Sequence, residues 1–177
     1  MKKLVIVISG EPGAGTSTIA KKVAEKLHLK YLSPGKTFKN YLDEDETDAA
    51  LDFWQTKFGK SKKLHEMLDA DQIKAAKKGN VVICGKLSIH FIKKYATLTV
   101  WLNVPLDVRA RRSSGRDGIS FEEAKKDIFE REQLERNQWK KMYGFDYLNQ
   151  KDEANLVLDS SDMTVEETVD AILEKMK

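Results

Sequence analysis

The sequence predicts an α/β fold with three layers, in which helices cover both faces of a five-stranded parallel sheet. Short apolar runs at 4–8, 81–84, 98–102 and 155–158 alternate with stretches of helical periodicity. Nearly continuous apolar runs are typical of strands that are covered on both faces, and alternation with helices favours parallel pairing. A fifth, weaker strand is expected around residues 31–32.

The first strand leads directly into a glycine-rich turn and then into a helix that should begin near Ser17. Glycine permits positive φ and leaves backbone N–H groups unobstructed, so several amides and the start of the helix can bind one anion. We therefore predict a phosphate-binding loop, although a glycine-rich turn without a ligand is the alternative. The predicted nucleotide-binding residues are Gly10, Pro12, Gly13, Ala14, Gly15, Thr16, Ser17 and Thr18.

This loop departs at one position from the pattern G-x-x-x-x-G-K-[ST]. Thr16 stands where the pattern has a lysine that reaches the β- and γ-phosphates, while Ser17 keeps the hydroxyl that holds Mg²⁺. Lys22 lies too far along the next helix to replace that lysine, and we expect it to be exposed to solvent. The missing positive charge should therefore come from another part of the chain.

The remaining helices are predicted from periodicity and from their first residues. Residues 36–78 have helical character with a break near 59–61, and the acidic residues at 43–48 are interpreted as a solvated helix face rather than a metal site. Capping boxes are predicted at Ser120 to Glu123 and at Thr164 to Glu167. The helix after Ser120 should end near Tyr143, before Gly144, and the helix after Thr164 should close the chain.

Arginine is confined to one segment. All six arginines occur between 109 and 136, whereas lysine is used elsewhere. A guanidinium group matches phosphate oxygens with a rigid fork of donors, so this clustering predicts a helical lid over about 109–136, with a flexible tip at 113–118. We expect Arg112, Arg116 and Arg131 to contact phosphate. For Arg109 and Arg111, surface ion pairs explain the residues equally well.

Composition limits the remaining possibilities. A chain of 177 residues without an internal linker fits one domain over 1–177, and a net charge of +3 argues against a general nucleic-acid binder. One cysteine, Cys84, suits a reducing compartment and a buried packing role. No apolar run approaches the roughly 20 residues of a membrane span. We expect a cytoplasmic monomer with no nucleic-acid or membrane partner.

The chain contains several motifs in the same order as small nucleoside monophosphate kinases, and it resembles more narrowly the short archaeal type of cytidylate kinase. The resemblance extends over nearly the whole chain and rests on 9–18, 31–39, 82–87, the arginine segment with 130–132, 143–144 and 157–161. It implies a P-loop kinase fold and transfer of the γ-phosphoryl group of ATP to CMP or dCMP with Mg²⁺. Ser17 would bind Mg²⁺, Arg112 and Arg116 would close on the transferred group, and Arg131 would bridge donor and acceptor.

The same resemblance implies an acceptor site within a helical region of about 33–78 together with later segments. Its expected residues are Ser33, Gly35, Lys39, Gly85, Lys86 and Glu135. Lys39, Lys86 and Gln138 stand where this family usually has arginine, so the acceptor phosphate would be held by charge without bidentate geometry. Two alternatives remain at this point: a kinase for another monophosphate such as AMP or UMP, and a nucleotide-binding module with little turnover.

Overall fold

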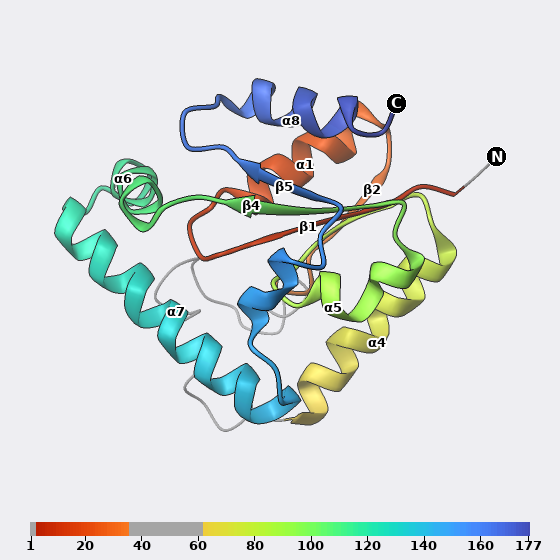
Figure 1. The fold of residues 1–177 in the computed structure, drawn as a ribbon, viewed down its shortest axis with the longest axis horizontal. Helices are drawn as coiled ribbons and strands as arrows, with labels where there is room; N and C mark the ends of the chain where they lie inside the picture. The colour runs from red at the N-terminus through yellow and green to blue at the C-terminus, as the bar shows by residue number, and fades with distance from the viewer. Residues whose placement is uncertain (1–2, 36–61) are drawn as a thin grey trace.

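The computed structural model describes residues 3–35 and 62–177, and its strands form one parallel sheet. Figure 1 shows this sheet between two layers of helices, which confirms the predicted three-layer α/β fold. The strand order is β2-β3-β1-β4-β5. The strands are β1 (Val5–Gly10), β2 (Lys30–Leu32), β3 (Val81–Cys84), β4 (Leu98–Asn103) and β5 (Leu156–Asp159).

The helices expected after the glycine-rich turn, after Ser120 and after Thr164 begin within one residue of the predicted positions, whereas the helix Ser88–Ile92 and the two 3-10 turns were not predicted. The helices before β4 are α1 (Thr16–Lys26), α4 (Lys62–Lys78), α5 (Ser88–Ile92) and the 3-10 turn η1 (Lys93–Tyr95). Those after β4 are α6 (Leu106–Asp117), α7 (Phe121–Tyr143), the 3-10 turn η2 (Tyr147–Lys151) and α8 (Val165–Glu174). Helix α7 ends at Tyr143 as predicted, and Gly144 follows it in the left-handed conformation with φ 79°.

The two faces of the sheet have separate apolar cores. Ile6 and Ile8 point to the face that α1 and α8 cover, whereas Val5 and Val7 point to the face of α4, α5 and α7. Alternating residues of a strand point to opposite faces, so a strand buried on both faces needs apolar residues at every position. This requirement explains the continuous apolar runs in the sequence.

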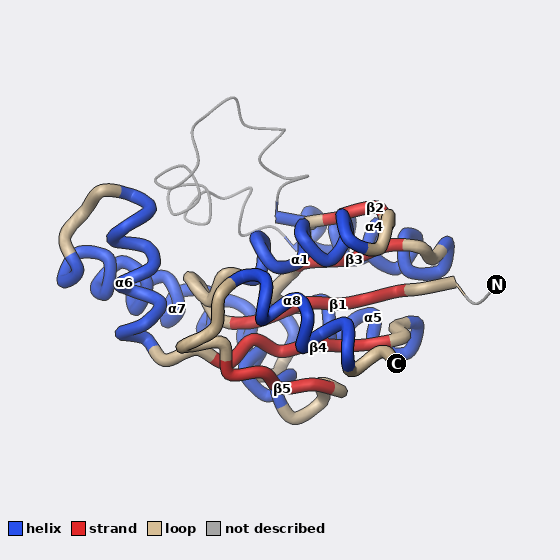
Figure 2. Tube along the Cα trace, turned by 90° about the horizontal axis from the view of Figure 1, so that it is seen from above, coloured by secondary structure: helices blue, strands red, loops and turns tan. Residues whose placement is uncertain are grey.

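The sheet topology places a crevice at the carboxyl end of β1. The chain first builds β2 and β3 on one side of β1 and then β4 and β5 on the other, so β1 is flanked by β3 and β4. Ligands of open α/β sheets bind where the strand order reverses, outside the carboxyl ends of the strands. Figure 2 shows α6 and α7 beyond this end of the sheet, opposite the chain's N-terminus.

Two local predictions need correction. The flexible tip expected at 113–118 is helical as far as Asp117, and only Gly118 to Ser120 separate α6 from α7. At Thr164 both bonds of the capping box form, but at Ser120 the described bonds include only the one that its side chain accepts from Glu123 N. The break near 59–61 and the acidic residues at 43–48 lie outside the described residues.

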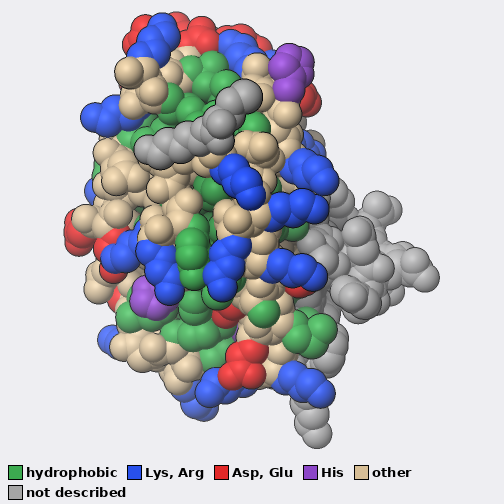
Figure 3. Space-filling model, turned by 90° about the vertical axis from the view of Figure 1, so that its right-hand side faces the viewer, with side chains coloured by type: hydrophobic (Ala, Val, Ile, Leu, Met, Phe, Trp, Pro, Cys, Tyr) green, Lys and Arg blue, Asp and Glu red, His purple; other side chains and the backbone are tan. Residues whose placement is uncertain are grey.

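The surface away from the crevice is rich in lysine. Figure 3 views the molecule from the side of the chain's N-terminus, and basic side chains gather on this face. Exposed Lys30 begins β2, and exposed Lys77 and Lys78 end α4. Positive charge by itself therefore does not mark the site. Within 3–35 and 62–177, no helix is both long enough and apolar enough to cross a membrane.

Candidate active site

The loop between β1 and α1 presents backbone N–H groups to a ligand. Gly15 precedes the first turn of α1 with φ 86°, and no side chain caps this helix and no acidic residue lies in its first turn. A Cβ built on Gly15 would meet no atom within 4 Å. The amides at the positive end of the α1 dipole therefore face open space, as an anion site requires.

Close packing fixes the opposite side of this loop. A Cβ on Gly10 would lie 2.8 Å from the backbone oxygen of Leu102 in β4, so this position accepts only glycine without movement of the strand. Gly13 has φ 81°, and its Cβ would lie 3.1 Å from Ile128 and 3.2 Å from Arg109. The loop is thus held against β4, α6 and α7 while its amide side stays open.

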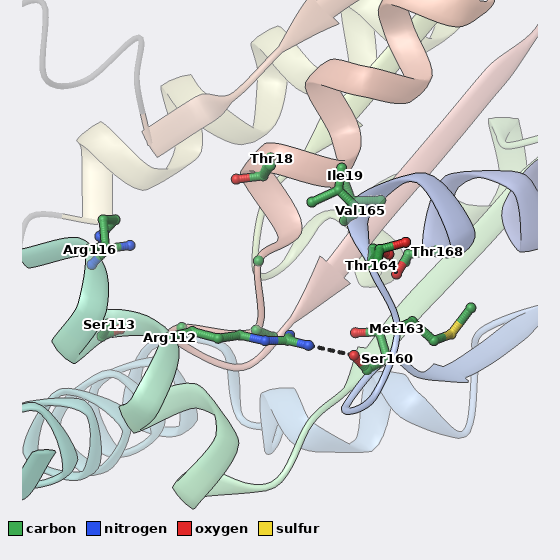
Figure 4. A pocket seen from close by; sticks show the side chains of 13 residues that line it. Thr18, Ile19, Arg112, Ser113, Arg116, Ser160, Met163, Thr164, Val165 and Thr168 are labelled. Atoms are coloured by element: carbon green, nitrogen blue, oxygen red, sulfur yellow. Dashed lines mark hydrogen bonds between the residues drawn. The ribbon is translucent and has the colours of Figure 1, made fainter.

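A cavity of about 380 Å³ adjoins the loop and receives side chains from α1, α6 and the start of α8. Its lining residues are Gly13, Ala14, Gly15, Thr18, Ile19, Arg112, Ser113, Arg116, Ser160, Met163, Thr164, Val165 and Thr168. In Figure 4 the Arg112 side chain points across the cavity toward Ser160. Its Nη2 donates to the backbone oxygens of Ser160 and Ser161.

Arg116 lies one turn beyond Arg112 on the same side of α6. Its side chain is 64% exposed and forms an ion pair with Asp117 at 2.6 Å. This pair lowers the pKa of Asp117 through a hydrogen bond to the carboxylate. An exposed pair of this kind contributes little stability, so Arg116 can leave Asp117 for a phosphate group.

Beside the loop, Lys86, Arg131 and Glu135 form a second charged group. Glu135 is 3% exposed and accepts hydrogen bonds from Lys86 Nζ and, at 3.0 Å, from Arg131 Nε. Burial favours the protonated acid, but the two cations outweigh it and hold the pKa of Glu135 below its ordinary value. Burial and the nearby Arg131 lower the pKa of Lys86 to about 8.

The turn that carries Lys86 is fixed by buried hydrogen bonds. Ser9 Oγ donates to the backbone oxygen of Gly85 at 2.6 Å, and Gln150 Nε2 donates to that of Lys86 at 2.7 Å. Pro34 packs against Gly85, since a Cβ there would lie 3.3 Å from its ring. The structure thus brings the segment of Ser33 and Gly35 next to Gly85 and Lys86. Lys39 lies outside the described residues.

Ser17 is the residue that the sequence predicts to bind Mg²⁺. It is an exposed residue in the first turn of α1, and its side chain contacts Cys84 Sγ at 3.9 Å and interacts with the Tyr31 side chain. Its oxygen is therefore available as a ligand of Mg²⁺, which prefers oxygen and is usually held by few protein groups together with substrate phosphates. Burial raises the pKa of the Cys84 thiol, which supports the packing role predicted for it.

Arg109 is the functional candidate whose place the sequence left open. It forms the ion pair with Glu132 that this interpretation includes, but it is 3% exposed, so the expected surface location is wrong for Arg109, whereas Arg111 is exposed. Arg109 donates to backbone oxygens of Val104 and Pro12 and to Glu132, each at 2.9 Å. Helical periodicity was the available signal, because positions 109, 112 and 116 share one side of a helix.

A phosphate loop that joins the central strand of a parallel sheet to a helix, beside an arginine-bearing helical pair, defines a P-loop kinase. A shikimate kinase from Bacteroides thetaiotaomicron shares this fold, with a TM-score of 0.63 and 21% identity over 97% of this chain and 96% of that chain. At this identity, the likeness concerns the fold alone.

The chain belongs to the cytidylate kinase-like family, whose model matches residues 5–162. A cytidylate kinase from Ignicoccus hospitalis is 39% identical over 80% of this chain and 81% of its own length. One from Pyrococcus horikoshii is 39% identical over 90% of this chain and 81% of its own length. The predicted membership is thus confirmed, and the chain is a nucleoside monophosphate kinase.

Proposed function

We propose that this kinase transfers the γ-phosphoryl group of ATP to CMP or dCMP. The observation that carries the proposal is the position of two sites at the carboxyl ends of the neighbouring strands β1 and β3. The phosphate loop follows β1, and the turn with Lys86 follows β3, beside Arg131 and Glu135. A donor and an acceptor phosphate bound at these sites would face each other across one crevice.

The donor side combines the loop with the cavity of Figure 4. Backbone amides from Gly13 to Ser17 would bind the ATP phosphates, and the nucleoside would occupy the space toward Thr164 and Val165. Arg112, already directed into this space, would cover the nucleotide and place its charge near the phosphates. Ser17 would hold Mg²⁺, which would supply positive charge to neutralise the charge that develops on the phosphates during transfer.

On the acceptor side, Lys86 and Arg131 would bind the 5′-phosphate of the monophosphate. An oxygen of that phosphate attacks the γ-phosphorus, the bond to the β–γ bridging oxygen breaks, and ADP leaves with the electron pair of that bond. Little covalent chemistry is required of the protein, so the residues act by alignment and by neutralising charge. Arg131 would bridge the donor and acceptor phosphates, and Arg116 would close from α6.

A coupled assay of ADP release tests the proposal. The purified protein is given MgATP with CMP, dCMP, UMP, AMP or GMP at saturating concentrations. We expect CMP or dCMP to have the highest kcat/KM. A higher value for AMP, GMP or UMP would replace the proposed acceptor, and ATP binding without turnover on any acceptor would contradict phosphoryl transfer by this protein.

A further inference from the structure

A buried arginine joins four segments of the site that are distant in sequence. Arg109 stands on α6 and donates through Nε to Val104 at the end of β4 and through Nη1 to Pro12 in the phosphate loop and Glu132 on α7. Nη2 also reaches Glu11 in the loop at 3.4 Å. A planar guanidinium fixes the relative directions of its partners, which a flexible ammonium group cannot do.

Arg109 contacts the loop at both ends of its side chain, through Cβ beside Gly13 and through the guanidinium on Pro12 and Glu11. Gly13 lies so near to Arg109 and Ile128 that even one added carbon would be tight against both. The open, ligand-facing side of the loop at Gly15 is only two residues away. The guanidinium itself bonds to the backbone oxygen of Pro12 in this loop, so its displacement would disturb the amides that follow.

The charge of Arg109 is satisfied within the protein. Glu11 and Glu132 are the carboxylates that pair with it, and their side chains are 18% and 13% exposed. Burial raises the pKa of Glu11 and Arg109 opposes this rise, so the guanidinium helps to keep that carboxylate ionised. Since protein oxygens accept its hydrogen bonds, Arg109 acts on the ligand through the loop and not by contact with phosphate.

We propose that Arg109 is a positioning residue, which holds the phosphate loop in its anion-binding shape and ties it, through Glu132, to the α7 segment that carries Arg131. This inference rests on the proposed function in taking the loop as the donor-phosphate site. In this proposal, a buried ion-pair network aligns the loop, which has threonine in place of lysine at position 16.

Variants at Arg109 test the proposal, with Arg111→Met as the matched control on the exposed side of the same helix. Calorimetry measures binding of MgATP and of magnesium tripolyphosphate, and steady-state kinetics gives KM for each substrate. We expect Arg109→Met to weaken binding of both phosphate ligands about 10-fold or more, because small displacements of positioning groups have large effects. KM for the acceptor should change much less, and Arg111→Met should bind both ligands normally.

Arg109→Lys and the double variant Arg109→Met/Glu132→Gln separate positioning from folding. The lysine keeps the charge without the fork, and the double variant removes a buried carboxylate left without its partner. Both should regain melting temperature relative to Arg109→Met while phosphate binding stays weak. Wild-type phosphate binding in either variant, or equal losses for both substrates in Arg109→Met, would overturn the proposal. Tripolyphosphate binding needs no acceptor, so absence of CMP turnover alone leaves this inference standing.

Discussion

Glu135 is the residue that brings Lys86 and Arg131 together. A buried carboxylate without a partner would destabilise the folded protein, but Lys86 and Arg131 both donate hydrogen bonds to Glu135. The same bonds place a lysine and an arginine at one location before any substrate binds. If Lys86 and Arg131 bind the acceptor phosphate as proposed, this arrangement would reduce the side-chain entropy lost on binding.

Arg131→Ala tests the transition-state role of this arginine. We expect kcat to fall about 10²- to 10³-fold, as for loss of one group that stabilises developing charge, while the Kd for MgATP stays nearly unchanged. Steady-state kinetics and calorimetry measure the two quantities. Arg136→Ala is the control on the same helix, where the arginine pairs with Asp146 away from Glu135. Parallel losses of kcat and ATP affinity in Arg131→Ala would contradict the role.

The acidity of Lys86 predicts a pH dependence. Its pKa of about 8 means that the free enzyme carries this charge below pH 8 and loses it as the pH rises through that value. The substrate phosphate ionises near pH 6, so it no longer changes in this range. We expect kcat/KM for the acceptor to fall above pH 8. In Lys86→Arg this fall should move to higher pH, because arginine stays protonated. Identical pH profiles for the two proteins would exclude Lys86 as the titrating group.

At the level of elements, α6 and α7 act as a pair. Ala110 of α6 packs with Ala124 and Ile128 of α7 in a small apolar core of their own. Gly118 ends α6 with φ 70°, which allows the chain to reverse within three residues. The sequence predicted the pair and its arginines, but the serines and Gly115 suggested a loop where the helix continues. The packing of α6 on α7 outweighs the weak helix propensity of these serines and of Gly115.

The capping box of α8 gives a prediction for stability. Thr164 Oγ1 accepts from Glu167 N at 3.2 Å, and the Glu167 carboxylate accepts from Thr164 N at 2.8 Å. Thr164→Ala removes the first bond and should lower the free energy of unfolding by about 1 kcal/mol. Urea denaturation measures this change, and Thr164→Ser, which keeps a hydroxyl, should stay near wild type. Equal stabilities of the alanine and serine variants would show that the cap does not contribute.

Across the whole molecule, the described residues bury their apolar side chains on both faces of one sheet. Trp101 and Trp139 belong to the core on the α4, α5 and α7 side. A single domain over 1–177 stays a prediction, because residues 36–61 are not described.

The distribution of exposed apolar side chains predicts a monomer. Met67, Phe129 and Val157 are the large exposed hydrophobic residues within 3–35 and 62–177, and they stand on three different elements. Stable interfaces bury about 800 Å² per partner around an apolar centre, which scattered residues do not provide. Light scattering after size exclusion should give a mass near 20.2 kDa at micromolar concentration. Twice that mass would contradict the prediction.

The sequence by itself determined the strands, the phosphate loop and most helix ends of this protein. These features depend on the local hydrophobic pattern and on backbone conformations that only glycine adopts easily. It also determined the family, through motifs in a fixed order. Tertiary structure decided which charges meet: Glu135 between Lys86 and Arg131, and Arg109 between the loop and α7. Such pairings join residues far apart along the chain, and only the packing of the elements determines whether an arginine faces solvent or another segment.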